Sequence, residues 1–343
     1  MRDEAVDTTL TGPFDVVVVG GGSAGLAGAL TLARARRSVL LLDSGSPRNA
    51  QAAHLHGYLG RDGAGPAELL ASGRAEVAGY GGEIRSGAAG TVLAADRLPD
   101  GGFVVRCADG STVRAGRLLV ATGLLDELPD LPGLRERWGR EVLHCPYCHG
   151  WEVRDQPVAV LATGPFAVHQ AQLWRNWSDR VTLLSHTWQL TDEDRELLSA
   201  LGVAVVEGEV TALDVTGDRL AGVTLTGGTA VTCAALVVAP RFTARSGVLA
   251  GLGLPVVTVE RAGAVIGTCV EADPATGATA LPGVWVAGNV TNPMEQLAGA
   301  AAAGVRAAIA VTTDLIEAET RRALAAHRAG GGPGGDGREQ GGA

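Results

Sequence analysis

The sequence predicts an α/β protein made of two Rossmann-like domains, the second inserted in the first. Two stretches, which begin at residues 14 and 157, each read as a buried strand, a turn, a helix and another strand. From residue 282 onward, the sequence again reads as a strand, a loop and then helical residues. Strands that alternate with helices are typical of parallel sheets in α/β proteins.

The first unit reads "FDVVVVGGGSAGLAGALTLARARRSVLLLD" and opens with a continuous apolar, β-branched run, as a strand buried on both faces does. A helix is expected over residues 23–36 and a second strand over 38–43. Residues 103–120 are expected to form strands around an Asp-Gly turn. They end in a buried strand at 118–121.

The second unit, 157–185, repeats the strand–turn–helix–strand order. The final unit is expected to give a strand, a loop and two helical stretches. The Gly-rich residues 328–343 lack core-forming side chains, which predicts disorder. Between the second and final units we expect a helix over 191–201 and short strands over 203–206, 209–214, 220–225 and 235–240.

Composition limits the classes of function. The net charge is −9 and the pI is about 5.3, so neither nucleic acid nor an anionic membrane surface would be attracted. All 28 basic residues are arginine, which excludes a lysine Schiff base and a Walker phosphate loop. The N-terminal residues lack the apolar core of a signal peptide, and no stretch of about 18 residues reads as a membrane span. We therefore expect a cytoplasmic protein, in a compartment where thiols are kept reduced.

The motif "GGGSAG" at residues 20–25 fits G-x-G-x-x-G between a buried strand and a helix. Gly20 allows the tight turn, Gly22 lets the backbone approach a pyrophosphate, and Gly25 permits close packing of helix on strand. An acid at the end of the next strand is placed to bind a ribose hydroxyl. The sequence therefore predicts a dinucleotide site. Its candidate residues are Gly20, Gly22, Ser23, Ala24, Gly25 and Asp43.

The stretch "HCPYCHGW", residues 144–151, contains a C-x-x-C pair. The pattern C-x-x-C-H also marks c-type haem attachment, but that chemistry requires export. Structural zinc needs four ligands, whereas the three other cysteines are isolated and the flanking histidines are too close for the usual spacing, so we expect no metal. "CPYC" resembles the glutaredoxin active site as well, although that motif lies near the start of a small domain.

A redox dithiol is the reading that we favour for Cys145 and Cys148. A helix N-terminus at this pair would lower the thiolate pKa, and Pro146 suits a first helical turn. A flanking histidine can carry the proton that each thiol–disulfide step requires. We favour His149 for this role over His144.

Two further segments are similar to the second and third fingerprints of flavoproteins that bind two dinucleotides. They are "RLLVATG" at 117–123 and "GVWVAGN" at 283–289. In those proteins an Asp after the last Gly holds the ribityl chain of the flavin, and Asn289 stands in its place here. The resemblance implies FAD contacts from Ala121, Thr122, Gly123, Gly288 and Asn289.

From about Phe14 to about Ala325 the chain resembles the low-molecular-weight thioredoxin reductases, FAD-dependent pyridine nucleotide–disulfide oxidoreductases of class II. The resemblance implies that Cys148 faces the flavin and that Cys145 exchanges with the substrate. His149 stands where the family has an acid–base Asp. The segment "MEQLAGAAAAG" at 294–304 matches the family segment that reaches the flavin. It adds Gln296 and Leu297 as candidates and has Glu295 where Arg is usual.

The second nucleotide motif departs from the family. Its G-x-G-x-x-A reads "ATGPFA" at 162–167, and Pro-Phe crowds the turn. The H-R-R that clamps the NADPH 2′-phosphate reads Ser185-His186-Thr187. Loss of the turn glycine and of both arginines should cost several kcal/mol of cofactor binding. The use of NADPH is therefore doubtful.

This pattern is similar to the dithiol oxidases of gliotoxin and holomycin biosynthesis, a branch that keeps FAD and has abandoned NADPH. "HCPYCHGWEVRD" at 144–155 and "SPRNAQAAHLHGYLGRDG" at 46–63 fit that branch. The resemblance places Arg48 and Asn49 at the flavin. It makes His54 and His56 candidates for a substrate pocket, although a solvated loop would explain these two equally well.

The resemblance implies an FAD-dependent oxidase that closes a disulfide in a small-molecule dithiol and passes electrons to dioxygen. A first alternative is an NAD(P)H-dependent reductase for thioredoxin or a similar protein. A second, from another class, is a redox sensor that holds FAD without turnover. A homodimer is expected from the resemblance alone. The expected segments are a disordered 1–13, an FAD-binding domain of 14–126 and 241–327, an inserted NAD(P)-like domain of 127–240 that carries the C-x-x-C, and a disordered 328–343.

Overall fold

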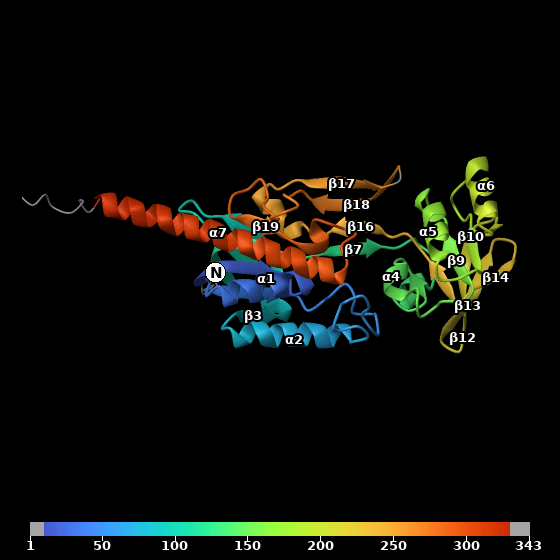
Figure 1. Ribbon diagram of the computed structural model, residues 1–343, viewed down its shortest axis with the longest axis horizontal. Helices are drawn as coiled ribbons and strands as arrows, with labels where there is room; N and C mark the ends of the chain where they lie inside the picture. Colours follow the sequence, from blue (N-terminus) through green and yellow to red (C-terminus); the bar gives the residue numbers. More distant parts are fainter. Residues whose placement is uncertain (1–9, 262, 330–343) are drawn as a thin grey trace, which may run out of the picture.

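The computed structural model of the protein describes residues 10–261 and 263–329. Within these residues two bodies lie side by side, each with a largely parallel sheet at its centre (Figure 1). The larger body contains both ends of the described chain. The smaller one is made of the middle of the sequence. This arrangement confirms the predicted fold class of two Rossmann-type domains, as the sheet connections below show.

The main sheet is buried on both faces because its central strands are continuously apolar. Val16 and Val18 of the first strand pack under the helices, whereas Val17 and Val19 face a second core on the opposite side. Within the described chain the strand order is β3-β2-β1-β6-β5-β4, with β19 beside β6. The strands are β1 (Leu10–Val19), β2 (Val39–Asp43), β3 (Glu83–Ser86), β4 (Val92–Arg97), β5 (Phe103–Cys107), β6 (Thr112–Val120) and β19 (Val284–Val286).

Three helices cover one face of this sheet: α1 (Ser23–Arg34), α2 (Pro66–Gly79) and α7 (Leu297–Ala329) (Figure 1). Two glycines let α1 and α7 cross closely. A Cβ on Gly304 would strike the Ala24 carbonyl oxygen, and a Cβ on Gly28 would lie 3.2 Å from the Gly304 carbonyl oxygen. The start of α7 is thereby held against the turn between β1 and α1.

By length and composition α7 could cross a membrane, since an 18-residue window of it has a mean hydropathy of 1.3. The expectation that no stretch is apolar enough is therefore wrong on those criteria. The physical reason for the apolar residues is a different one. Ala300, Ala307 and Val311 are buried against α1 and the sheet, which accounts for the buried third of that window.

The smaller body has the parallel strand order β11-β10-β9-β15-β8. Val158 and Val160 of β9 face its helices, and Ala159 and Leu161 face a small antiparallel sheet. The parallel strands are β8 (Val142–Leu143), β9 (Val158–Leu161), β10 (Val181–Leu184), β11 (Ala204–Val206) and β15 (Ala235–Val237). The helices are α3 (Leu134–Arg137), α4 (Pro146–His149), α5 (Phe166–Trp174) and α6 (Asp192–Ala200). The antiparallel strands are β12 (Val210–Thr216), β13 (Arg219–Leu225) and β14 (Ala230–Thr232).

The chain passes between the bodies at two strands, β7 (Leu124–Glu127) and β16 (Arg241–Ala244). These strands are hydrogen-bonded to each other in antiparallel register, with Phe242 opposite Asp126. On its other edge β16 pairs with β18 (Ala264–Val270), which pairs with β17 (Val256–Arg261). The expected division at 126/127 and 240/241 stays a proposal, which the position of this two-stranded connection supports.

Several expected boundaries differ from the structure. The first strand begins at Leu10, so 10–13 are not part of a disordered N-terminus; 1–9 lie outside the described residues. The two helical stretches at the C-terminal end are one helix of 33 residues that includes 328 and 329. The rest of the expected tail, 330–343, is likewise outside the described residues.

Candidate active site

One cavity of about 1010 Å³ extends from the first body to the second. The β1–α1 turn, the ends of β2 and β6, and the start of α7 line it on one side; α4 and α5 line it on the other. With the exception of Gly25, every candidate residue from the sequence lines this cavity. They are Gly20, Gly22, Ser23, Ala24, Asp43, Arg48, Asn49, Ala121, Thr122, Gly123, His144, Cys145, Cys148, His149, Gly288, Asn289, Gln296 and Leu297.

The glycine turn has the geometry that a pyrophosphate requires. Gly20 has φ +107°, and a Cβ there would strike the Ala121 carbonyl. A Cβ on Gly25 would strike the Gly20 carbonyl oxygen, which explains why Gly25 serves packing and does not reach the cavity. Gly22 has no atom within 4 Å of its Cβ position, so a ligand can approach the backbone there.

The first turn of α1 offers donors toward this space. Gly22 at the N-cap has no side chain to satisfy the helix N–H groups. Among the described residues, the buried hydroxyl of Ser23 has no hydrogen-bond partner. An uncapped helix N-terminus beside an unpartnered hydroxyl fits a dinucleotide pyrophosphate. The residues of this turn thus fit the group that the motif predicts.

Asp43 ends β2 next to the same turn. Its carboxylate lies against Gly21, where a Cβ would collide with it, and it accepts a hydrogen bond from the Gly45 amide at 3.2 Å. Its side chain is 14% exposed and lines the cavity. This is the position in which an acid can accept a hydrogen bond from a ribose hydroxyl.

Asn289 differs from the acid expected at its position, and its contacts give the reason. Its Nδ2 lies within hydrogen-bond distance of the backbone carbonyls of Asn292, Pro293 and Glu295, at 3.2, 3.3 and 2.9 Å. A carboxylate could donate to none of them. The amide therefore fixes the loop that precedes α7, and its Oδ1 is the atom left for a cofactor hydroxyl.

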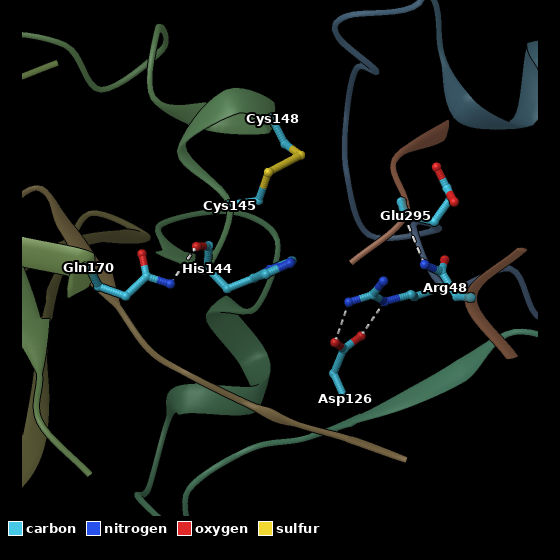
Figure 2. The surroundings of a disulfide bond; sticks show 8 residues. Arg48, Asp126, His144, Cys145, Cys148, Gln170 and Glu295 are labelled. Carbon is cyan, nitrogen blue, oxygen red and sulfur yellow. Dashed lines mark hydrogen bonds and ion pairs between the residues drawn. A yellow bond between two sulfur atoms is a disulfide. The ribbon is translucent and has the colours of Figure 1, made fainter. Parts of the chain in front are cut away.

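Cys145 and Cys148 form a disulfide, with their Cα atoms 5.4 Å apart. Cys145 is the N-cap of α4 and Pro146 occupies the first helical position, as the sequence predicts. Figure 2 shows the disulfide on one side and Glu295 and Arg48 on the opposite side. All four line the cavity. In the described chain, His, Cys, Asp and Glu side chains form no group of three that could hold a metal ion.

His149 follows Cys148 directly and is placed for proton transfer. Burial lowers its pKa below 6.5, Glu152 opposes that effect, and His56 adds to it. Both Nδ1 and Nε2 are buried, and the structure provides neither with a hydrogen-bond partner among the residues that it describes. The ring is thus neutral at pH 7 and has a nitrogen available to accept a proton.

His144 has different surroundings. Its ring stacks on Trp138 at 5.4 Å and meets the edge of Phe242 at 5.8 Å. Burial, with the nearby Arg48 cation, lowers the pKa of His144 to about 3. His144 therefore stays neutral throughout the physiological range and is held by ring contacts.

Arg48 lines the cavity, but its guanidinium is already paired. Nε and Nη2 donate to the Asp126 carboxylate at 2.8 and 2.6 Å, and the cation lies 5.3 Å from the Phe242 ring centroid. Asp126 and Phe242 were not found from the sequence. Each depends on a contact between distant segments, for which a single sequence carries no local signal.

The two loop histidines also line the cavity. His54 Nδ1 lies 3.0 Å from the Gly63 carbonyl oxygen. His56 lies between two acids, 3.5 Å from Asp62 and 3.4 Å from Glu152. The second contact joins the loop of the first body to the segment that follows α4.

One face of α5 completes the wall of the cavity and was also missed. Phe166, His169, Gln170 and Leu173 recur at helical spacing and all line it. The sequence reads this helix only as the start of a degenerate nucleotide motif. The 3–4 spacing of the four residues is the signal that could have identified the face.

Comparisons with known proteins agree with this geometry. The family model described as "Pyridine nucleotide-disulphide oxidoreductase" matches residues 14–304. Thioredoxin reductase sirT of Leptosphaeria maculans is 30% identical over 321 residues, which cover 89% of this chain and 95% of sirT. Thioredoxin reductase tcpT of Claviceps purpurea is 36% identical over 195 residues, 55% of this chain and 60% of tcpT. The chain thus spans somewhat under two thirds of the length of tcpT.

Solved structures show the same fold. The crystal structure of HlmI superposes with a TM-score of 0.86 at 47% identity and covers 94% of this chain and 98% of HlmI. The oxidoreductase from Agrobacterium tumefaciens gives 0.81 at 34% identity, with 89% and 99% covered. Family match, relatives and fold agree with the resemblance drawn from the motifs. The chain belongs to the pyridine nucleotide-disulphide oxidoreductase family and is a thioredoxin-reductase-like oxidoreductase.

Proposed function

We propose that the protein is an FAD-dependent oxidase that converts a small-molecule dithiol to a disulfide with dioxygen as the acceptor. One observation carries the proposal: the Cys145–Cys148 disulfide and the dinucleotide cradle of Gly22 and Asp43 line a single cavity. A redox disulfide and a bound flavin would then share one enclosed space. The resemblance of residues 144–155 to the gliotoxin and holomycin dithiol oxidases supports this reading.

The chemistry at the cysteines is balanced as follows. A substrate thiolate attacks the sulfur of Cys145, the Cys145–Cys148 bond breaks, and Cys148 leaves as a thiolate. The second substrate thiol then attacks the substrate sulfur of this mixed disulfide, expels Cys145 as a thiolate, and leaves as the oxidised product. The cysteine pair has gained two electrons. FAD, held at Gly22 and Asp43, would supply the two-electron acceptor, and with dioxygen as the final oxidant the overall reaction would convert dithiol and dioxygen to disulfide and hydrogen peroxide.

His149 is the group that we assign to the protons. It is adjacent to Cys148, buried, and neutral at pH 7 because burial lowers its pKa. It can take the proton that a substrate thiol releases and return it later. His144 is assigned a packing role, because its pKa is about 3 and its ring is stacked on Trp138.

The second nucleotide site supports the absence of a pyridine nucleotide step. Ser185 is buried and its hydroxyl accepts a hydrogen bond from the Gly208 amide at 3.1 Å. His186 Nδ1 accepts one from the Val210 amide at 3.0 Å. His186, at one of the family's two arginine positions, is therefore used by the protein's own backbone, and Thr187, at the other, carries no charge. We propose that NADPH is not a substrate.

An NAD(P)H-dependent thioredoxin reductase is the second candidate, because curated relatives carry the name thioredoxin reductase. The test is anaerobic. Holoenzyme is mixed with dithiothreitol or with NADPH, and the visible absorbance of the flavin is followed. Bleaching by the dithiol alone supports the oxidase; rapid bleaching by NADPH refutes it. If neither reductant bleaches the flavin, the protein holds FAD without turnover, as a sensor would. A cytoplasmic homodimer is the form in which we expect the enzyme to act.

A further inference from the structure

One arginine that lines the cavity has no place in the steps described so far. Arg245 follows β16 directly, where the chain re-enters the larger body. Its backbone is fixed at the end of β6, because its amide donates to the Gly123 carbonyl at 3.0 Å and its carbonyl accepts from the Thr122 hydroxyl at 2.6 Å. Its side chain reaches the loop after β2, where Nη1 donates to the Ser46 carbonyl at 3.3 Å.

The side chain of Arg245 therefore lies across the C-terminal end of β1. In the sheet, β1 lies between β2 and β6, so a residue fixed at the end of β6 and bonded beyond the end of β2 passes the glycine turn. Two interstrand spacings measure about 9–10 Å, a distance that an extended arginine and one hydrogen bond can bridge. The contacts agree, because a Cβ on Gly20 would lie 3.1 Å from the Thr122 amide nitrogen. Ligands of open α/β sheets bind at this edge.

The charge of Arg245 is not used by the protein. Four arginines line the cavity in the described chain, and Arg48 and Arg241 each lie within ion-pair distance of a carboxylate. Arg261 is exposed at the end of β17. Arg245 is half-buried, and no ion pair within the part of the chain that the structure describes includes it. Its guanidinium thus faces the cavity with one backbone partner.

A bound dinucleotide would need such a charge. The two phosphates of a dinucleotide are anionic, the Asp43 carboxylate lies against Gly21 of the same turn, and the chain has a net charge of −9. The N-terminus of α1 compensates only about half a charge. Because the chain contains no lysine, arginine is the side chain left that is cationic at every relevant pH. Its planar fork also matches the geometry of phosphate oxygens.

We propose that Arg245 is a cofactor-binding residue whose guanidinium contacts the diphosphate of the dinucleotide and compensates its charge. The bond to the Ser46 carbonyl holds the side chain in place before the cofactor binds, so little side-chain freedom is lost on binding. The proposal rests on the FAD of the proposed function and is independent of the electron acceptor.

The test measures FAD binding to the apoprotein by calorimetry at low and at high ionic strength. Arg245→Met removes the charge and should raise Kd about 10- to 100-fold at low ionic strength, as loss of one charge-assisted hydrogen bond does. High ionic strength should narrow this difference. Arg245→Gln also removes the charge but keeps an N–H donor for the Ser46 carbonyl. It should weaken binding at least about 10-fold as well, so the test stands should Arg245→Met not fold.

Arg241→Met is the matched control. Arg241 belongs to β16, lines the same cavity and already faces Glu127, so its replacement should change Kd by less than about 2-fold. Unchanged affinity in both Arg245 variants, or an equal loss in Arg241→Met, overturns the assignment. Normal binding by Arg245→Gln alone, or a loss that is the same at both ionic strengths, overturns it too. Either result would mean that Arg245 only tethers the loop at Ser46.

The proposed function is judged separately. If dithiothreitol bleaches the flavin but the Arg245 variants bind FAD normally, the oxidase stands and the role of Arg245 is wrong. If the Arg245 variants lose FAD but no dithiol bleaches the flavin of the unmodified protein, the role of Arg245 stands and the oxidase is wrong. An unmodified apoprotein that binds no FAD would refute both.

Discussion

Removal of Arg48 should loosen the connection between the two bodies. Arg48 lies in the loop after β2 and binds Asp126 of β7 through two hydrogen bonds. Its cation also covers Phe242, which is directly opposite Asp126 in β16 and in edge contact with His144. His144 in turn stacks on Trp138, so a continuous series of side-chain contacts runs from Asp126 and Arg48 into the smaller body. Arg48→Met removes the charge and keeps a side chain of similar length.

The magnitude follows from burial. The Asp126 side chain is 8% exposed and that of Arg48 is 25% exposed. Loss of one partner of a fully buried ion pair costs about 3–5 kcal/mol, and the cation–π contact adds about 0.5–1 kcal/mol. Because Arg48 is partly solvated, we expect Arg48→Met to lower the free energy of unfolding by about 2–4 kcal/mol.

The assay is urea unfolding followed by circular dichroism with free FAD in excess. Arg61→Met is the matched control, because Arg61 lies in the same loop and has only an exposed partner, Glu68, at 3.7 Å. It should cost less than about 0.5 kcal/mol. Asp126→Asn and the double variant complete a cycle with a coupling of at least about 1 kcal/mol. Equal effects of Arg48→Met and Arg61→Met, or no coupling, would refute the structural reasoning.

Three other outcomes are expected. Cys148→Ser should keep the bound-FAD spectrum yet lose all flavin bleaching by dithiothreitol under anaerobic conditions; retained bleaching would contradict the relay. Gly22→Ala should weaken FAD binding and change the free energy of unfolding of the apoprotein by less than about 0.5 kcal/mol, because the added Cβ meets no atom. Gly25→Ala should destabilise the apoprotein itself, because its Cβ strikes the Gly20 carbonyl oxygen. Thermal unfolding of the two apoproteins measures this difference. In the folded protein the pKa of His144 is about 3, whereas in the unfolded chain it is about 6.5. As pH falls, the unfolded chain therefore binds this proton first. The contribution of neutral His144 to the free energy of unfolding is complete above pH 6.5 and is lost as pH falls toward 3. Between pH 7 and 5 the unmodified protein should therefore lose up to about 2 kcal/mol more than His144→Phe, and equal losses in urea titrations would contradict this.

Local chemistry was predictable from the sequence. The glycine turn, the acid at Asp43 and the helix start at Cys145 each depend on a few consecutive residues with special backbone or side-chain properties. These residue types tolerate few other arrangements, so the motif and the geometry coincide. The apolar run before Gly20 likewise predicted a strand buried on both faces.

Features that depend on tertiary contacts were not predictable. The contact of Arg48 with the flavin stays a prediction, whereas its ion pair with Asp126 was missed because Asp126 is far away in sequence. The C-terminal end was split into two helical stretches, although Gly304 is tolerated within one helix because it packs on Ala24. The strands β17 (VVTVER) and β18 (AVIGTCV) were missed although both are rich in β-branched residues; their pairing with each other and with β16 joins separate segments of the chain.

The double crossing at β7 and β16 has a mechanical consequence. Four residues of each strand are paired in antiparallel register, so the two strands form one ribbon and should turn together. Any rotation of the smaller body would then move α4 with it as part of one rigid body, about a single axis. Such a rotation would turn the two sulfurs first toward the dinucleotide cradle and then toward solvent. The distance between the two sulfur atoms would stay the same throughout.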